Sequence, residues 1–115
     1  MTVDQLLDRY VEIGTQQDEA LFNDAFSRFN RLFDKMVNIE KELQSRGLLA
    51  RRALMRLYEH PNRQVRLNAA KETLAVAPTE ARNVIEEIRD SKWFPQFFDA
   101  AMTIRGLDDG TYKPE

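Results

Sequence analysis

Arginines are concentrated in the middle of the 115-residue chain, where they could bind phosphate groups. Arg52 and Arg56 are four residues apart and would share one face of a helix, next to Arg51. Arg63 follows in the next segment. A guanidinium group presents N–H donors in a plane that matches the oxygens of phosphate or carboxylate groups. The cluster therefore indicates either a binding surface for an anionic partner or a solvated helix face.

The distribution of charge argues against general affinity for nucleic acid. Residues 41–71 carry eight basic and two acidic side chains, whereas residues 1–40 and 72–115 each have a net charge of −4. The whole chain has a formal net charge of −2, and its acidic segments would repel a polyanion. Nucleic-acid binding through the arginines is therefore the alternative function, and another protein is the favoured partner.

The densest aromatic cluster lies near the C-terminus, at Trp93, Phe94, Phe97 and Phe98. One interpretation is that Trp93 and Phe97 close the end of the hydrophobic core. The other is that Trp93 and Phe94 stay exposed and anchor a partner protein, because tryptophan is over-represented at interface hot spots. The pattern alone leaves both interpretations open.

Residues suited to catalysis or metal binding are scarce. His60 is the single histidine, it precedes Pro61 in an expected loop, and the chain has no cysteine. Neighbouring acids such as Glu86 and Glu87 do not face each other on a helix. No glycine-rich phosphate loop or serine nucleophile motif occurs. We therefore expect no enzymatic activity, no cofactor and no metal.

The elements that must position these residues are all helical. Apolar residues recur every three or four positions along the chain, and no stretch alternates as a half-buried strand does. The pattern predicts an all-α fold of about six helices. The expected helices cover residues 3–22, 25–46, 48–59, 63–77, 79–90 and 95–106, and a tail of residues 107–115 follows.

Capping and terminating residues set the ends of these helices. Asn62 can cap the fourth helix with its side-chain oxygen, and Thr79 can do the same for the fifth. Pro95 suits the first turn of the sixth helix, which we expect to end at Gly106. Gly14, inside the first helix, indicates either a weak point or a site of close packing.

The second helix has an unusually wide apolar face. Its central positions follow strict helical spacing, and Phe22, Phe26 and Phe33 widen the face on its flanks. Such a face is typical of a helix that packs in the core against two neighbours. The alternative is that part of the face is kept for a second chain, including a second copy of this one.

A pattern of apolar residues occurs twice, 31 residues apart. Ala50, Ala53, Leu54 and Leu57 recur as Ala81, Val84, Ile85 and Ile88, and the pair Ala69 and Ala70 recurs as Ala100 and Ala101. Periods of this length are typical of stacked helical repeats, in which each unit buries its apolar face against a neighbour.

The first copy resembles the second helix of a HEAT repeat. The resemblance is carried by Asn62, the pair Val65 and Arg66, the small residues Ala69 and Ala70, and Leu74. Asn62 stands where HEAT repeats favour aspartate. The second copy is degenerate, since Gln96 and Phe97 replace Val65 and Arg66, and it resembles a terminal capping unit.

Beyond the repeat, nearly the whole chain resembles an uncharacterised bacterial family of small, all-helical, HEAT-like proteins. The residues that carry this resemblance are 29–32, 60–62 with 64–66, 75–78 with 80–81, 94–96, and 107–110 with 113–114. The resemblance implies one domain over residues 1–115 and a cytoplasmic setting, but no activity. Within it we expect a long helical hairpin at 1–47, a HEAT-like unit at 48–77, a degenerate closing unit at 78–106 and the tail.

These observations favour a non-enzymatic module that binds another protein, as an adaptor or as an immunity protein that binds a toxin. The candidate interaction surface comprises Arg51, Arg52, Arg56, Arg63, Trp93 and Phe94. No stretch is long and apolar enough to cross a membrane, and no signal peptide is visible, so we expect a cytoplasmic protein.

Overall fold

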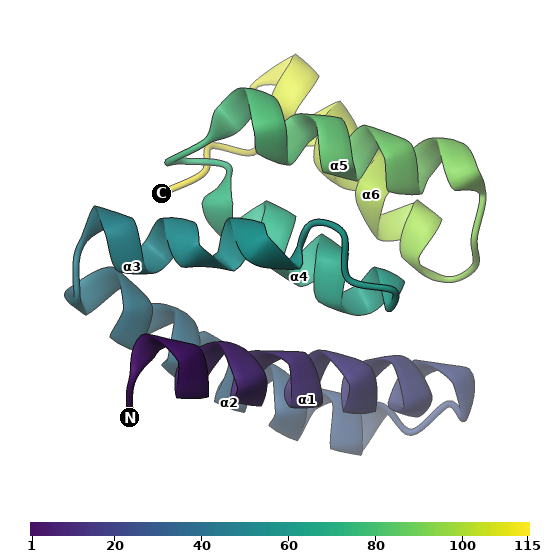
Figure 1. The fold of residues 1–115 in the computed structure, drawn as a ribbon. Coiled ribbons are helices and arrows are strands. Elements are labelled where there is room, and N and C mark those ends of the chain that lie inside the picture. The colour runs from purple at the N-terminus through teal and green to yellow at the C-terminus, as the bar shows by residue number, and fades with distance from the viewer.

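The chain folds into three successive pairs of helices (Figure 1). The computed structural model describes residues 1–115 and contains no β-strand, which confirms the predicted all-α fold. Helix α4 lies centrally and contacts α1, η1, α5 and α6. The helices are α1 (Val3–Phe22), α2 (Phe26–Ser45), α3 (Leu48–Arg52), the 3₁₀-helix η1 (Ala53–Leu57), α4 (Arg63–Thr73), α5 (Pro78–Ser91) and α6 (Gln96–Asp109).

Side-chain caps fix the start of α1 and α4. The Thr2 hydroxyl accepts a hydrogen bond from the Gln5 amide, and the Gln5 side chain accepts one from the Thr2 amide. The Asn62 side-chain oxygen accepts from the amides of Gln64 and Val65, at 2.9 and 3.1 Å. The predicted cap at Asn62 is therefore confirmed, and α4 begins where the sequence indicated.

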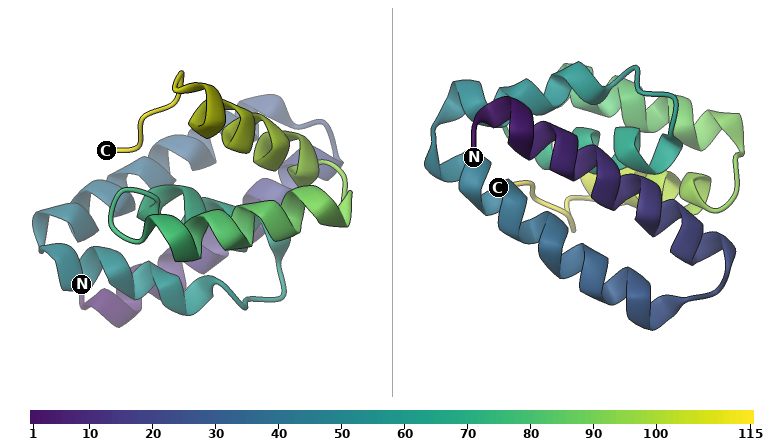
Figure 2. Two further views of the ribbon diagram at one scale, coloured as in Figure 1. Left: turned by 90° about the horizontal axis from the view of Figure 1, so that it is seen from above. Right: turned by 60° about the horizontal axis from the view of Figure 1, so that its bottom comes forward.

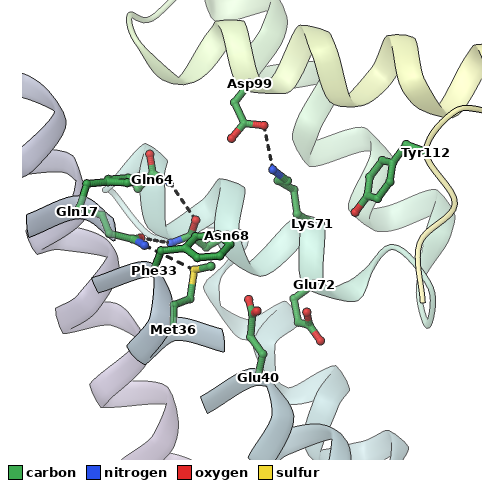
Figure 3. Close-up of a pocket in the computed structure, with 11 residues that line it drawn as sticks. Gln17, Phe33, Met36, Glu40, Gln64, Asn68, Lys71, Glu72, Asp99 and Tyr112 are labelled. Carbon is green, nitrogen blue, oxygen red and sulfur yellow. Dashed lines mark hydrogen bonds and ion pairs between the residues drawn. The ribbon is translucent and has the colours of Figure 1, made fainter. Parts of the chain in front are cut away.

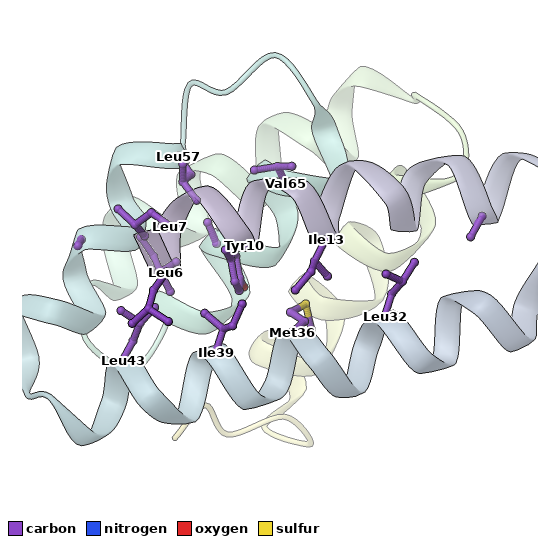
Figure 4. Packing of buried hydrophobic residues seen from close by; sticks show 14 residues of the cluster. Leu6, Leu7, Tyr10, Ile13, Leu32, Met36, Ile39, Leu43, Leu57 and Val65 are labelled. Atoms are coloured by element: carbon purple, nitrogen blue, oxygen red, sulfur yellow. The ribbon is translucent and has the colours of Figure 1, made fainter. Parts of the chain in front are cut away.

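The hydrophobic core has two parts. The larger joins α1 and α2 to η1 and α4, and includes Tyr10, Ile13, Leu32 and Leu43 (Figure 4). The smaller joins α4, α5 and α6. The repeated positions of η1 and of α5 are all buried, whereas Ala50 of α3 is half-buried. The 31-residue pattern thus marks equivalent core positions.

The wide apolar face of α2 is buried only along its centre. Leu32 and Leu43 lie in the core, whereas Phe22, Phe26 and Phe33 on the flanks are exposed. The expectation that the whole face packs in the core is therefore wrong. The flank of this face therefore presents aromatic side chains to solvent, and no other part of the fold covers them.

The third and fourth helices are shorter than predicted. The segment expected as one helix over 48–59 becomes 3₁₀-helical from Ala53, and its tighter winding aligns Leu54 and Leu57 on one buried face. Helix α4 ends at Thr73 rather than at Ala77, because the backbone changes to three-residue turns at Leu74 and Val76, just ahead of Pro78.

Two predicted boundaries near the C-terminus are also wrong. Helix α5 begins at Pro78 with Ala77 as its N-cap, since proline has no N–H to satisfy in a first turn, and Thr79 lies inside the helix. Helix α6 runs past Gly106 to Asp109, and Gly110 follows as its C-cap with a φ of 78°. Gly106 is buried instead and packs closely against the tail, since a Cβ there would lie 2.9 Å from the Cβ of Tyr112.

Gly14 is a site of close packing between α1 and α4. A Cβ at this position would lie 2.8 Å from Val65 Cγ2 and 3.3 Å from Val65 Cα. We therefore expect Gly14→Ala to lower the free energy of unfolding by about 1–3 kcal/mol, although alanine favours a helix more than glycine does. Chemical denaturation measures the change.

The matched control for this prediction is the double variant with Val65→Ala, which removes the nearest clashing methyl group. The cost of Gly14→Ala should shrink in that background. A stabilising effect of Gly14→Ala in the unmodified chain would contradict the close packing.

None of the helices combines the length and the apolar composition that a membrane-spanning helix needs.

In both views of Figure 2 the C-terminal end of the chain lies beside α2. The tail is held there by a hydrogen bond of 3.0 Å from Arg51 to the Glu115 carbonyl. It therefore returns to the N-terminal half of the molecule and closes one end of the site described next.

Candidate functional site

A pocket of about 290 Å³ opens between α2, α4, α6 and the C-terminal tail (Figure 3). We call it the deep pocket. Phe29, Phe33 and Met36 of α2 form its apolar wall, and polar side chains form the rest. The polar lining consists of Gln17, Glu40, Gln64, Asn68, Lys71, Glu72, Asp99 and Tyr112.

A second pocket of about 520 Å³ adjoins the first and is mostly apolar. We call it the shallow pocket, and its walls include Leu21, Phe94, Phe98 and Met102. It shares Phe29, Gln64 and Asp99 with the deep pocket, so the two pockets lie side by side, and we call them together the groove. One wall of this groove comes mainly from α2, the other from α6, and α4 supplies the floor.

A chain of buried amides forms the floor of the groove and joins three helices. Asn68 of α4 donates to Gln17 of α1 at 2.7 Å and accepts from Gln64 at 2.9 Å (Figure 3). Gln96 of α6 donates to Gln64 at 3.1 Å and to Asp18 at 2.7 Å. Amides can serve as donor and acceptor together, so the network connects α1, α4 and α6 through the interior.

Most of the charged side chains around the deep pocket are paired with one another. The Lys71 ammonium lies 2.9 Å from Asp99, and the Arg51 guanidinium lies 3.2 Å from the Glu72 carboxylate. Gln44 also donates to Glu72. Glu40 forms no ion pair, and its carboxylate instead accepts a hydrogen bond of 2.6 Å from the buried Tyr10 hydroxyl.

Burial raises the pKa of Glu40 to about 7, and the nearby Glu72 carboxylate adds to the effect. The hydrogen bond from Tyr10 and the positive charges of Lys71 and Arg51 lower the same pKa, but they do not offset the loss of water. Burial also raises the pKa of Tyr10, with the negative charge of Glu40 as the second cause. The Tyr10 hydroxyl therefore stays protonated and remains a donor.

Three arginines of the predicted surface form hydrogen bonds or ion pairs with other parts of the chain. Arg51 bridges α3 to α4 and to the tail, while Arg52 donates to the Val76 carbonyl at 2.7 and 3.0 Å. Arg56 pairs with Asp4 at the start of α1 at 2.9 Å. Each of these guanidinium groups thus contacts a different part of the chain.

Arg63 and the C-terminal aromatics lie together at one end of the molecule. The Arg63 guanidinium lies 4.1 Å from the centre of the Trp93 ring, as in a cation–π pair. Trp93 is 53% exposed and Phe94 is 70% exposed, so Trp93 does not close the core. Phe94 lines the shallow pocket and packs edge-on against Phe98, at 5.9 Å between ring centres.

Sequence reasoning missed the polar residues of the groove. Neither the charge distribution nor the apolar spacing of the sequence singles out Glu40 or Asn68. Two signals were present, because Gln17 falls on the apolar stripe of α1 and Gln96 replaces Val65 in the second copy of the repeat. A polar residue at a core position indicates a buried hydrogen-bond network.

The fold and the groove together define a class: a small all-helical protein made of three helix pairs, with a groove that is apolar at one end and polar at the other. The chain belongs to the family described as a domain of unknown function, DUF2019, whose model matches residues 4–108. No curated protein matches the chain.

A solved structure shows the same fold. The crystal structure of the protein RPA1889 from Rhodopseudomonas palustris is 51% identical in sequence and superimposes with a TM-score of 0.96. The match covers 100% of this chain and 95% of that one. The resemblance to a bacterial family of small all-helical proteins is confirmed to this extent, and the HEAT-like repeat stays a prediction.

Proposed function

We propose that the protein is a non-enzymatic protein-binding module and that the groove between α2 and α6 receives a segment of its partner. One observation carries the proposal: large apolar side chains stay exposed on both walls of a single groove. Phe33 of α2 is 46% exposed, and Phe98 and Met102 of α6 are 53% and 73% exposed. Phenylalanine and methionine are enriched in the cores of protein interfaces.

The form of the groove favours an amphipathic segment as its occupant. The shallow pocket offers an apolar surface, and the deep pocket offers hydrogen-bonding and charged groups next to it. A helix or extended peptide with one apolar face fits such a division. An adaptor or an immunity protein in the cytoplasm would use the groove in this way, and the HEAT-like interpretation agrees with it.

Nucleic-acid binding is the weaker candidate and we do not propose it. The surface it would use consists of Arg51, Arg52, Arg56 and Arg63, and each of these has a partner within the fold. A phosphate backbone would have to compete with those contacts, and the net charge of the chain is −2.

Photo-crosslinking in host cells tests the proposal. A benzophenone amino acid replaces Phe98 in the groove or, as a control, Leu49, which is 85% exposed on α3 and lies outside the groove. We expect a discrete protein adduct from position 98 and none from position 49.

Identification of the adduct separates the two kinds of partner. A different protein supports the proposed module, whereas a second copy of the chain supports self-association through the exposed flank of α2. Absence of any adduct at position 98, or the same adducts at both positions, would count against the groove as the binding surface.

A further inference from the structure

The charges around the deep pocket leave one acidic group without a counter-ion. Three carboxylates line the pocket, those of Glu40, Glu72 and Asp99, against the single ammonium of Lys71. Lys71 is paired with Asp99, and Glu72 is paired with Arg51. Glu40 is therefore the one carboxylate of the three that forms no ion pair within the chain.

The position of Glu40 suits it to receive a ligand. The residue is only 9% exposed, and its carboxyl group is directed into the pocket (Figure 3). One carboxylate oxygen accepts from Tyr10, and the other forms no hydrogen bond. This second oxygen keeps some contact with solvent, so it can accept a hydrogen bond from a ligand donor that enters the pocket.

The remaining walls favour an organic cation over other ligands. Phe29, Phe33 and Tyr112 place aromatic rings around the pocket, and aromatic faces attract ammonium and guanidinium groups. Anions would meet three carboxylates, and a purely apolar group would leave Glu40 unpaired. The acidic and histidine side chains form no group able to hold a metal ion.

The source of the cation follows from the position of the two pockets. The deep pocket lies next to the apolar shallow pocket, and Phe29, Gln64 and Asp99 line both. A segment lying in the shallow pocket on its apolar side chains can extend a long basic side chain into the deep pocket. Lysine and arginine have apolar stems that pack on Phe33 and Met36 while the charged head reaches an acid.

We propose that the deep pocket binds the ammonium or guanidinium group of one lysine or arginine side chain of the partner segment, paired with Glu40. This inference rests on the proposed function of the groove and adds the chemistry of the partner: an amphipathic segment with apolar residues next to one basic residue. Recognition of the basic residue would give the groove specificity that its apolar walls alone cannot supply.

Entry of the cation changes the protonation of the pocket. Burial holds the pKa of Glu40 near 7, so part of the population is protonated at neutral pH, and an incoming cation favours the ionised form. The other groups facing it are Glu72, Lys71, Arg51 and Tyr10, of which the first three are already paired and the last stays protonated. Binding should therefore strengthen between pH 6 and pH 8.

The test uses random peptides as the probe. A display library of 16-residue peptides is selected on the full chain at pH 8, and the affinities of selected peptides are measured by fluorescence anisotropy. We expect the selected sequences to share one lysine or arginine beside apolar residues. Glu40→Gln should weaken binding about 10-fold or more, as expected for a lost charged contact, and replacing the basic residue of the peptide by glutamine should do the same.

Matched controls separate this inference from the proposed function. Glu87→Gln removes an exposed carboxylate of α5 and should leave affinity unchanged, whereas Phe98→Ala should weaken every groove peptide. Peptides that lose affinity with Phe98→Ala but carry no basic residue, or that bind Glu40→Gln equally well, would overturn the inference and keep the proposed function. Failure to select any peptide that depends on Phe98 would overturn both.

A competition experiment tests whether the pocket binds the basic side chain of a peptide or a free small cation. n-Butylguanidinium is titrated as a competitor against the selected peptide. We expect it to compete only at concentrations far above the affinity of the peptide, because it lacks the apolar contacts. Competition at the same concentration as the peptide would assign the pocket to a small-molecule cation and overturn the inference.

Discussion

Asn68→Ala should lower the free energy of unfolding by about 2–4 kcal/mol. Asn68 is buried and bonds to Gln17 in α1 and to Gln64 within α4. Its removal leaves the Gln17 oxygen without a donor and a Gln64 N–H without this acceptor. Each unpaired buried polar group costs about 1–3 kcal/mol. Urea unfolding followed by circular dichroism measures the loss.

The matched control for this prediction is Asn83→Ala. Asn83 lies in α5, is exposed and makes no side-chain hydrogen bond, so its replacement should change stability by no more than about 0.5 kcal/mol. Equal effects of the two substitutions would mean that the amide network does not hold α1 against α4.

Glu40→Gln should stabilise the protein above pH 7 and have little effect near pH 4.5. Folding raises the pKa of Glu40 from 4.5 to about 7. As the pH rises from 4.5 to 7, the unfolded chain loses this proton while the folded chain keeps it, so the stability of the folded state falls. Above pH 7 the full cost is about 3 kcal/mol, at about 1.36 kcal/mol for each unit of pKa.

Glutamine avoids this cost, because it carries no charge and can still accept the hydrogen bond from Tyr10. The measurement is the difference in unfolding free energy between Glu40→Gln and the unmodified chain at several pH values from 4.5 to 8.5. We expect the difference to grow with pH in favour of glutamine. A difference that is constant with pH would contradict the raised pKa.

This cost connects the stability of the fold to its proposed function. Glu40 weakens the folded state at neutral pH, and glutamine could make the same hydrogen bond to Tyr10 without that cost. A role in folding therefore does not explain the glutamate. A cation bound in the deep pocket would offset the cost, because it stabilises the ionised form of Glu40. The stability measurement and the peptide selection therefore examine the same group by independent means.

Much of the fold could be predicted from the sequence, because periodicity and caps are local signals. The spacing of apolar residues gave α1 with its bounds, and the side chain of Asn62 gave the start of α4. The errors at Thr79 and Gly106 arise from contacts that the local sequence does not record. Gly106 resembles a helix stop in sequence, but its lack of a side chain is needed to admit Tyr112.

The candidate site was less predictable than the fold. The sequence indicates the exposed aromatics Trp93 and Phe94 as candidates, but the spacing along the chain groups arginines that the fold separates. Arg51 and Arg56 in fact contact distant segments, around Glu72 and Asp4. The groove itself depends on how α2, α4 and α6 are placed around it, and periodicity within each helix carries no information on that arrangement.

The affinity of the crosslinked partner for two variants tests the central claim most directly. Phe98→Ala removes an apolar side chain from the wall of the groove, and Leu49→Ala removes an exposed apolar side chain from a surface outside it. If the groove binds the partner, Phe98→Ala should weaken binding about 10-fold or more, as for an interface hot spot, and Leu49→Ala should change it less than about 2-fold. Unchanged affinity for Phe98→Ala, with its fold intact by circular dichroism, would contradict the account.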